Sequence, residues 1–147
     1  PESIESAKQN INLNSDFASK IETILVPSNG DRKILKDILP PDRRFDFCMC
    51  NPPFFDSLEK TQQNPKRNCP ATSSELVTPG GEFSFVKQMI DESLELGETI
   101  KWYTSMAGRK ASFKKLLGYL KSLEAIEEIQ TTEFCQGRQV RWGIGWR

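Results

Sequence analysis

The tetrapeptide Asn51-Pro52-Pro53-Phe54 is the part of this chain whose residue types and spacing favour chemistry most clearly. Two consecutive prolines hold the backbone extended and remove two N–H donors, which leaves a rigid rim of carbonyl oxygens beside the Asn51 amide. Because such a rim accepts hydrogen bonds, its complementary ligand is a planar exocyclic amine with two N–H donors. Phe54 or Phe55 offers an aromatic face on which the ring that carries the amine can stack.

The same groups suggest a reaction at that amine. If Asn51 Oδ1 and the Pro52 carbonyl accept both amine hydrogens, the nitrogen lone pair leaves conjugation and points at an electrophile. This is catalysis by positioning and electrostatics, and it requires no titrating base. The chain contains no His, which excludes Ser-His-Asp and Cys-His catalysis within it, as well as zinc sites that use histidine. The alternative is that the tetrapeptide is only a turn that ends a strand.

Composition narrows the class of protein further. The 147 residues suit one domain, and 20 basic against 20 acidic residues mean that a polyanion-binding face needs local clustering of charge. The four cysteines at 48, 50, 69 and 135 form no C-x-x-C motif, so we expect no zinc ribbon and no other metal site. Cys48 and Cys50 are expected to share one strand face as small buried hydrophobes, and unpaired thiols favour the cytosol or nucleus. No apolar stretch approaches the ~20 residues of a membrane span.

The elements that must position the tetrapeptide alternate between helices and strands. Apolar residues at helical spacing predict helices over residues 1–12, 31–39, 82–96 and 113–123. Apolar or alternating runs predict strands over residues 21–26, 45–50, 99–106, 126–134 and 140–146. The strand that ends at the tetrapeptide is almost entirely apolar, which is typical of burial on both faces. This order predicts a three-layer α/β sandwich with a mostly parallel sheet that ends in an antiparallel hairpin.

A polar segment follows the tetrapeptide. Residues 56–79 contain three prolines and no sustained periodicity, which predicts a long loop. Ligands of open α/β sheets bind beyond the carboxyl ends of the strands, so basic residues near the tetrapeptide could contact phosphates. The basic candidates are Lys66 and Arg67 in the loop and Arg138 and Arg141 around the final turn. A solvated loop and surface salt bridges are the alternative interpretations.

Four segments of the chain together resemble one known family. They are FDFCMCNPPFF (45–55), GGEFSFVKQMI (80–90), WYTSMAGRK (102–110) and TEFCQGRQVRW (132–142). The tetrapeptide alone is similar to the catalytic motif of adenine-N6 and amino-group methyltransferases. All four segments in order are similar to the methyltransferase-like 16 family of RNA adenine-N6 methyltransferases, which modify the U-six small nuclear RNA and messenger RNA hairpins. The bacterial ribosomal RNA adenine-N6 methyltransferase F is a relative.

The resemblance implies a Rossmann-like class I fold, S-adenosylmethionine as cofactor, structured RNA as partner, and a location in the nucleus or cytoplasm. By position, the residues that match the catalytic tetrad of the family are Asn51, Pro52, Pro53 and Phe54. Asn51 is also the expected contact to the cofactor. The residues that match RNA-contacting positions of the family are Lys66, Arg67, Arg138 and Arg141. The sequence does not indicate an oligomeric state.

One part of the family pattern is missing from the chain. The cofactor site of the family begins with a Gly-rich loop after the first strand and an acidic residue after the second, whereas Gly80-Gly81 follows a loop and is interpreted as a turn. We therefore expect residues 1–147 to be the C-terminal part of a single methyltransferase domain, truncated at its N-terminus and lacking much of the cofactor pocket. Two alternatives stay open: a non-catalytic RNA-binding module, and a methyltransferase acting on a protein glutamine amide. The second is less favoured because Phe54 stands where such enzymes carry Tyr.

Overall fold

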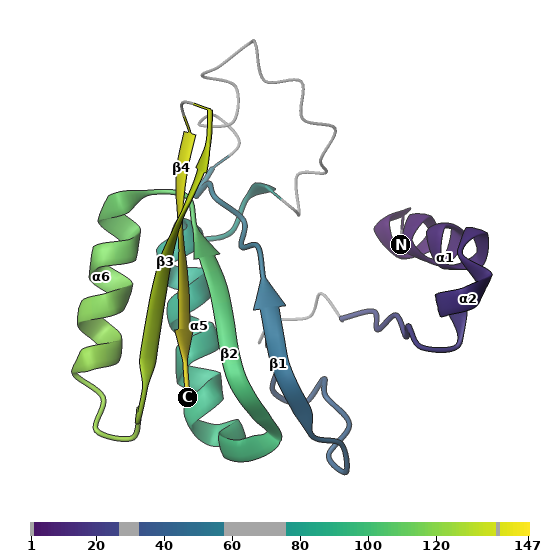
Figure 1. The fold of residues 1–147 in the computed structure, drawn as a ribbon, viewed down its shortest axis with the longest axis horizontal. Helices are drawn as coiled ribbons and strands as arrows, with labels where there is room; N and C mark the ends of the chain where they lie inside the picture. Colours follow the sequence, from purple (N-terminus) through teal and green to yellow (C-terminus); the bar gives the residue numbers. More distant parts are fainter. Residues whose placement is uncertain (1, 27–32, 58–75, 138) are drawn as a thin grey trace.

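The computed structural model describes residues 2–26, 33–57, 76–137 and 139–147. Its centre is a sheet of four strands in the order β1-β2-β4-β3 (Figure 1). The strands are β1 (Phe45–Cys50), β2 (Ile100–Ala107), β3 (Ile129–Gln136) and β4 (Gln139–Trp146). β1 and β2 pair in parallel, whereas β4 is antiparallel to both β2 and β3. The predicted antiparallel hairpin at the end of the sheet is therefore confirmed, and the described sheet is mixed.

Two helices cover one face of this sheet and form the core with it. α5 (Gly81–Leu96) and α6 (Lys110–Lys121) pack against each other and against β2 and β4, and a 3-10 turn, η1 (Gly97–Thr99), leads from α5 into β2. Alternate residues of β2 and β4 face the helices because side chains alternate along a strand. The residues buried between the helices and the sheet include Val86, Ile90, Tyr103, Leu116, Leu120, Ile144 and Trp146. The indole N–H of Trp146 donates to Ser93 Oγ at 2.9 Å, so the largest core side chain leaves no polar atom unpaired.

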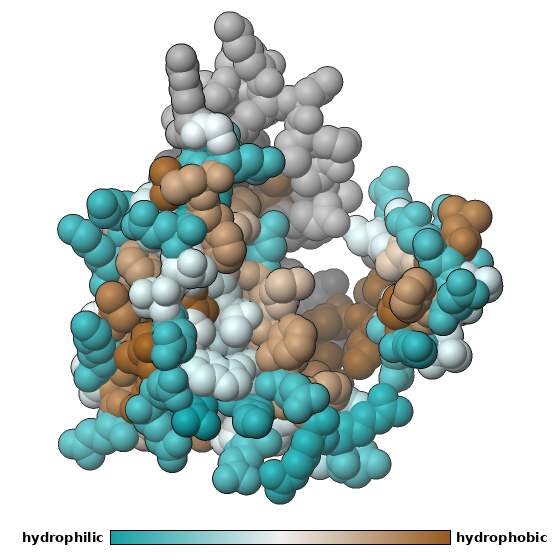
Figure 2. Space-filling view, viewed as in Figure 1, coloured by the Kyte–Doolittle hydropathy of each residue, from teal (hydrophilic) through white to brown (hydrophobic). Residues whose placement is uncertain are grey.

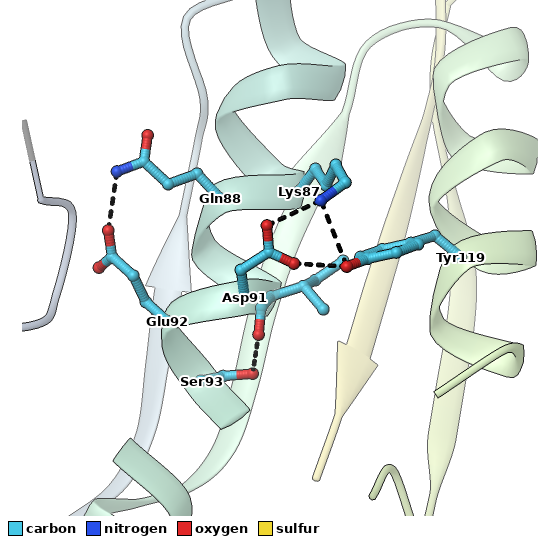
Figure 3. A network of polar contacts seen from close by, with 7 residues as sticks. Lys87, Gln88, Asp91, Glu92, Ser93 and Tyr119 are labelled. Carbon is cyan, nitrogen blue, oxygen red and sulfur yellow. Dashed lines mark hydrogen bonds and ion pairs between the residues drawn. The ribbon is translucent and has the colours of Figure 1, made fainter. Parts of the chain in front are cut away.

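Polar contacts hold α5 in place on two sides, and Figure 3 shows those with α6. The Tyr119 hydroxyl of α6 donates to Asp91, and the Lys87 ammonium donates to Asp91 at 2.8 Å and to the Tyr119 hydroxyl at 3.2 Å. On the other side, the buried Glu92 carboxylate accepts the backbone N–H groups of residues 34–36 at 2.7–3.0 Å. Hydrogen bonds to charged groups are stronger than neutral ones, so these contacts fix α5 against both α6 and the segment before β1.

The helix predicted over residues 31–39 is wrong for the described part of that range. Residues 36–38 form a turn between bends, and the N–H groups of Ile38 and Leu39 both donate to the Leu35 carbonyl at 3.2 Å. Asp37 then adopts a φ of 62°, in the left-handed region that a right-handed helix cannot contain. Because Asp37 lies within the turn that the Leu35 carbonyl closes, no helical turn forms there.

The strand predicted over residues 21–26 is also wrong. These residues have no regular secondary structure, and an ion pair between Glu22 and Arg43, at 3.1 Å, connects them to the segment before β1. A strand needs a neighbouring strand that forms hydrogen bonds with its N–H and C=O groups, and no described strand pairs with this segment. The β-branched composition was therefore not sufficient to form a strand.

The N-terminal helices lie apart from the sheet, beyond β1 (Figure 1). The helix predicted over residues 1–12 is confirmed as α1 (Glu2–Leu13), and a short α2 (Ser15–Ala18) follows it. No residue of α1 is buried, and Leu13 is 82% exposed. None of the described helices is both long enough and apolar enough to cross a membrane.

The second face of the sheet carries no helix in the described residues, so the predicted third layer is absent there. Phe47 and Met49 of β1 are 65% and 85% exposed, which corrects the prediction that this strand is buried on both faces. Figure 2 shows hydrophobic residues at the surface over this face and on the α1–α2 segment. An open groove of about 670 Å³ runs along the face, with Met49, Asn51, Trp102, Met106, Phe134, Gly143 and Gly145 in its lining. We call it the open-face groove.

Candidate active site

The tetrapeptide follows β1 directly, at the carboxyl end of the parallel β1–β2 pair. Asn51 is exposed, Pro52 and Pro53 are buried, and Phe54 is half-buried. Asn51 is one of the residues that line the open-face groove, and no group in the described part of the chain forms a hydrogen bond with its amide. The described residues thus leave both its oxygen and its NH₂ group open to a ligand, as a site for an amine requires.

A short parallel bridge holds the segment behind the tetrapeptide. The Phe55 N–H donates to the Leu76 carbonyl at 3.0 Å, and the Thr78 N–H donates to the Phe55 carbonyl at 2.9 Å. The chain then turns at Gly81, whose φ of 66° confirms the predicted glycine turn. A Cβ at Gly81 would lie 3.8 Å from the Phe54 carbonyl oxygen, so the start of α5 packs directly against the tetrapeptide.

The Phe54 ring lies against two residues from distant parts of the chain, Gly108 and Arg141. Gly108, directly after β2, lies so close that a Cβ there would come within 2.7 Å of the ring. The Arg141 guanidinium of β4 lies 5.7 Å from the ring centroid, a cation–π distance, and Nη1 donates to the Gly108 carbonyl at 3.4 Å. Glu82 of α5 accepts the Gly108 N–H at 2.7 Å. These contacts bring a guanidinium and a carboxylate to the backbone against which the Phe54 ring packs, three residues after Asn51.

The thiols next to the tetrapeptide are protonated near neutral pH. Burial raises the pKa of Cys50 to about 11, and burial also raises the pKa of Cys48. Both side chains face the same side of β1, as predicted, although they are half-buried rather than fully buried. Because the thiolate is the reactive form, Cys50 offers neither a nucleophile nor a base to a ligand bound at Asn51.

We expect alkylating reagents to modify the exposed Cys135 much faster than Cys50 at about pH 8. At that pH a thiol with a pKa of about 11 is ~10⁻³ ionised, and burial also restricts access to it. Site-resolved mass spectrometry after timed labelling measures the two rates, and the urea-unfolded protein, in which both thiols react alike, is the control. Equal rates for both thiols in the folded protein would contradict this expectation.

The raised pKa of Cys50 also makes stability depend on pH. The folded state retains the Cys50 proton to a higher pH than the unfolded state, in which the thiol has its ordinary pKa of 9.0. The free energy of unfolding therefore falls as the pH rises from about 9 to 11.

The structure describes one of the four basic residues that the resemblance implied. Arg141 lies at the tetrapeptide, half-buried, with its guanidinium directed to a carbonyl oxygen and the Phe54 ring. The other three, Lys66, Arg67 and Arg138, lie outside the described residues. In the part of the chain that is described, no group of three or more Cys, Asp or Glu side chains gathers as a metal site would require.

Three residues of the site were missed by the sequence analysis: Glu82, Gly108 and Arg109, whose guanidinium lies 6.0 Å from the Phe55 ring centroid. Gly108 and Arg109 directly follow β2, and the rule that ligands bind beyond carboxyl ends of strands could have identified them. Glu82 had no comparable local signal, because its contact depends on how α5 lies against β2.

Comparisons with known proteins connect this site to a family. The family model described as RNA methyltransferase matches residues 1–147, the whole chain. The chain belongs to this family. Similar proteins and solved structures confirm the resemblance to the methyltransferase-like 16 enzymes.

Among the relatives of this RNA methyltransferase chain is the U6 small nuclear RNA (adenine-(43)-N(6))-methyltransferase of Drosophila melanogaster, 41% identical over 160 residues. The alignment covers 99% of this chain and 51% of the relative. The hMettl16 catalytic domain in complex with a MAT2A 3′UTR hairpin is 36% identical with a TM-score of 0.78, covering 95% of this chain and 50% of that one. The N-terminal domain of human METTL16 in complex with SAH is 33% identical with a TM-score of 0.70, covering 97% and 46%. The chain thus spans about half the length of these matches.

Proposed function

We propose that this chain is part of an RNA adenine-N6 methyltransferase that transfers a methyl group from S-adenosylmethionine to the N6 amine of an adenosine in structured RNA. The observation that carries the proposal is the exposed Asn51 amide, which has no hydrogen-bond partner among the described residues and precedes the Pro52 carbonyl, in a chain of the RNA methyltransferase family. The names of the relatives favour a small nuclear RNA or a messenger RNA hairpin as substrate. A small nuclear RNA substrate favours the nucleus, and a messenger RNA substrate is compatible with the cytoplasm as well.

In this mechanism the residues of the tetrapeptide bind and orient the adenine. Asn51 Oδ1 and the Pro52 carbonyl accept the two N6 hydrogens, which directs the lone pair of the nitrogen outward. Pro53 keeps the backbone beside Asn51 rigid, and Phe54 stacks on the base after it has left the RNA helix. S-adenosylmethionine, when bound, supplies an electrophilic methyl group on a sulfonium sulfur.

The described residues fit one side of a cofactor site. Asn51 stands at the end of the open-face groove, where its amide can contact both the adenine and the cofactor. The Gly-rich loop and the acidic residue of the family pattern are absent from this sequence. We therefore propose that Asn51 contacts the cofactor and that residues outside this chain form the rest of the cofactor site.

We further infer that residues 1–147 form the C-terminal part of a single methyltransferase domain. Support comes from the open sheet face, where Phe47 and Met49 are largely exposed, and from Leu13, 82% exposed on α1. Exposed apolar surface of this extent is typical of an interface with further polypeptide. The chain also spans about half of its relatives, which leaves enough additional chain in such proteins to cover the face.

We propose Arg141, together with Lys66, Arg67 and Arg138, as the residues that contact the RNA backbone. Support for Arg141 is its position at the Phe54 ring, where it brings a positive charge beside the base. Phosphate contacts of this kind set affinity and orientation without reading sequence, so they complement a base site rather than replace it.

Methyl transfer to an RNA hairpin tests the proposed function. A protein of the relatives' length that carries this chain is incubated with methyl-labelled S-adenosylmethionine and a hairpin that presents one unpaired adenosine. N6-methyladenosine is the expected product, and a hairpin with inosine at that position, which lacks the amine, is the matched control. If a glutamine-containing peptide is methylated and the RNA hairpin is not, the acceptor is a protein glutamine amide and the proposed RNA substrate is wrong. RNA binding without methylation, and without calorimetric binding of S-adenosylmethionine, would favour a non-catalytic RNA-binding module.

A further inference from the structure

Glu82 is a buried carboxylate for which the proposed mechanism has no use. It lies in the first turn of α5 and is 2% exposed. Its Oε2 accepts the Gly108 N–H at 2.7 Å, whereas its Oε1 is buried and has no hydrogen-bond partner in the described part of the chain. Burial of a carboxylate costs free energy, and an unpaired buried oxygen adds to that cost. A hydrophobic side chain would serve stability alone better, which points to a role of this carboxylate at the neighbouring site.

Gly108 connects this carboxylate to the aromatic ring of the tetrapeptide. A Cβ at Gly108 would lie 2.7 Å from Cδ1 of Phe54 and 3.1 Å from Oε2 of Glu82, so the backbone here touches both groups. On its other side, the Gly108 carbonyl accepts Arg141 Nη1 at 3.4 Å. Gly108 is thus held by a carboxylate at its N–H and a guanidinium at its carbonyl, and the Phe54 ring rests against it.

We propose that Glu82 is a positioning residue for the proposed methyl transfer: by holding the Gly108 N–H, it fixes the wall against which Phe54 packs and so sets the plane on which the adenine stacks. This inference rests on the proposed function of the tetrapeptide. Without the carboxylate, the backbone after β2 is released and the ring can turn. The adenine then binds with its amine out of line with Asn51, which lowers kcat more than it raises KM.

Three variants in a protein of the relatives' length test the inference. Glu82→Ala removes the contact to Gly108, and we expect kcat to fall about 10-fold with KM for RNA and for cofactor within about 3-fold. Glu82→Gln keeps an oxygen that can accept the Gly108 N–H, so kcat stays within about 3-fold of the unchanged protein. Gly108→Ala keeps the Glu82 carboxylate but adds a methyl group that crowds both the ring and Oε2, and it lowers kcat as Glu82→Ala does.

Glu92→Ala is the matched control, because Glu92 is also a buried α5 carboxylate that accepts backbone N–H groups, but from residues 34–36. It should lower the melting temperature without lowering kcat per folded molecule. A hairpin with 2-aminopurine at the target position reports stacking directly, and its fluorescence should be stronger in Glu82→Ala than in the unchanged protein or in Glu92→Ala.

Two results overturn the inference: unchanged kcat and fluorescence in Glu82→Ala, or equal losses in Glu82→Ala and Glu92→Ala, which would indicate a purely structural role. If Glu82→Ala does not fold, Gly108→Ala decides, and unchanged kcat in that variant overturns the inference. Failure of the proposed function is distinguishable, because the unchanged protein itself would then transfer no methyl group to RNA.

Discussion

Asn51→Ala is expected to lower kcat for methyl transfer to RNA by about 10³-fold, ~4 kcal/mol of transition-state stabilisation. The amide is exposed and free of hydrogen bonds to the described residues, so the fold does not depend on it. Its loss removes the acceptor that aligns the N6 lone pair, an interaction that matters most in the transition state. Single-turnover kinetics measure the effect, and RNA affinity should stay within a few-fold.

Asn12→Ala provides the control for this experiment. Asn12 lies on α1 and is also exposed, so the same side chain is removed far from the tetrapeptide. Its turnover should equal that of the unchanged protein, which shows that the loss in Asn51→Ala is specific to the site. Retained turnover in Asn51→Ala would reject the assigned role of this amide.

Phe54→Ala is expected to lower kcat/KM by about 30-fold, ~2 kcal/mol, because stacking of a base on an aromatic side chain is worth about 1–3 kcal/mol. The half-buried ring also packs on Gly108 and under the Arg141 guanidinium, so its removal releases both neighbours. Steady-state kinetics with a hairpin substrate measure the loss. Circular dichroism and thermal melting confirm that the variant remains folded.

Phe54→Tyr is the matched variant, because it keeps the aromatic face and adds only a hydroxyl group. We expect it to retain kcat/KM within about 3-fold, as sequence-tolerant stacking predicts. Equal losses in Phe54→Tyr and Phe54→Ala would show that stacking on this ring does not contribute to activity. A loss of RNA affinity without a change in kcat would instead assign the ring to binding alone.

The helices and strands whose hydrophobic pattern is complete within the segment itself were predictable from the sequence. The apolar stripe of α5 and the alternation in β4 are properties of short segments, and both elements form where predicted. Segments that depend on a neighbour were not predictable in this way. Residues 21–26 have the composition of a strand but no described partner, and β1 has the composition of a strand buried on both faces but is covered on one.

The sequence by itself determined the chemistry that the tetrapeptide can offer. The Pro52-Pro53 pair removes two N–H donors and stiffens the backbone through its covalent structure alone. The rigid rim of carbonyl oxygens beside Asn51 is therefore a local property of the chain. Its surroundings were decided only by the tertiary structure. Gly108 is distant in sequence from Phe54, and so is the Glu82 that binds it; they meet the ring because the start of α5 and the end of β2 lie against the segment that follows β1. Contacts of this kind depend on the packing of whole elements, to which each residue contributes only a small part, and no local pattern encodes them.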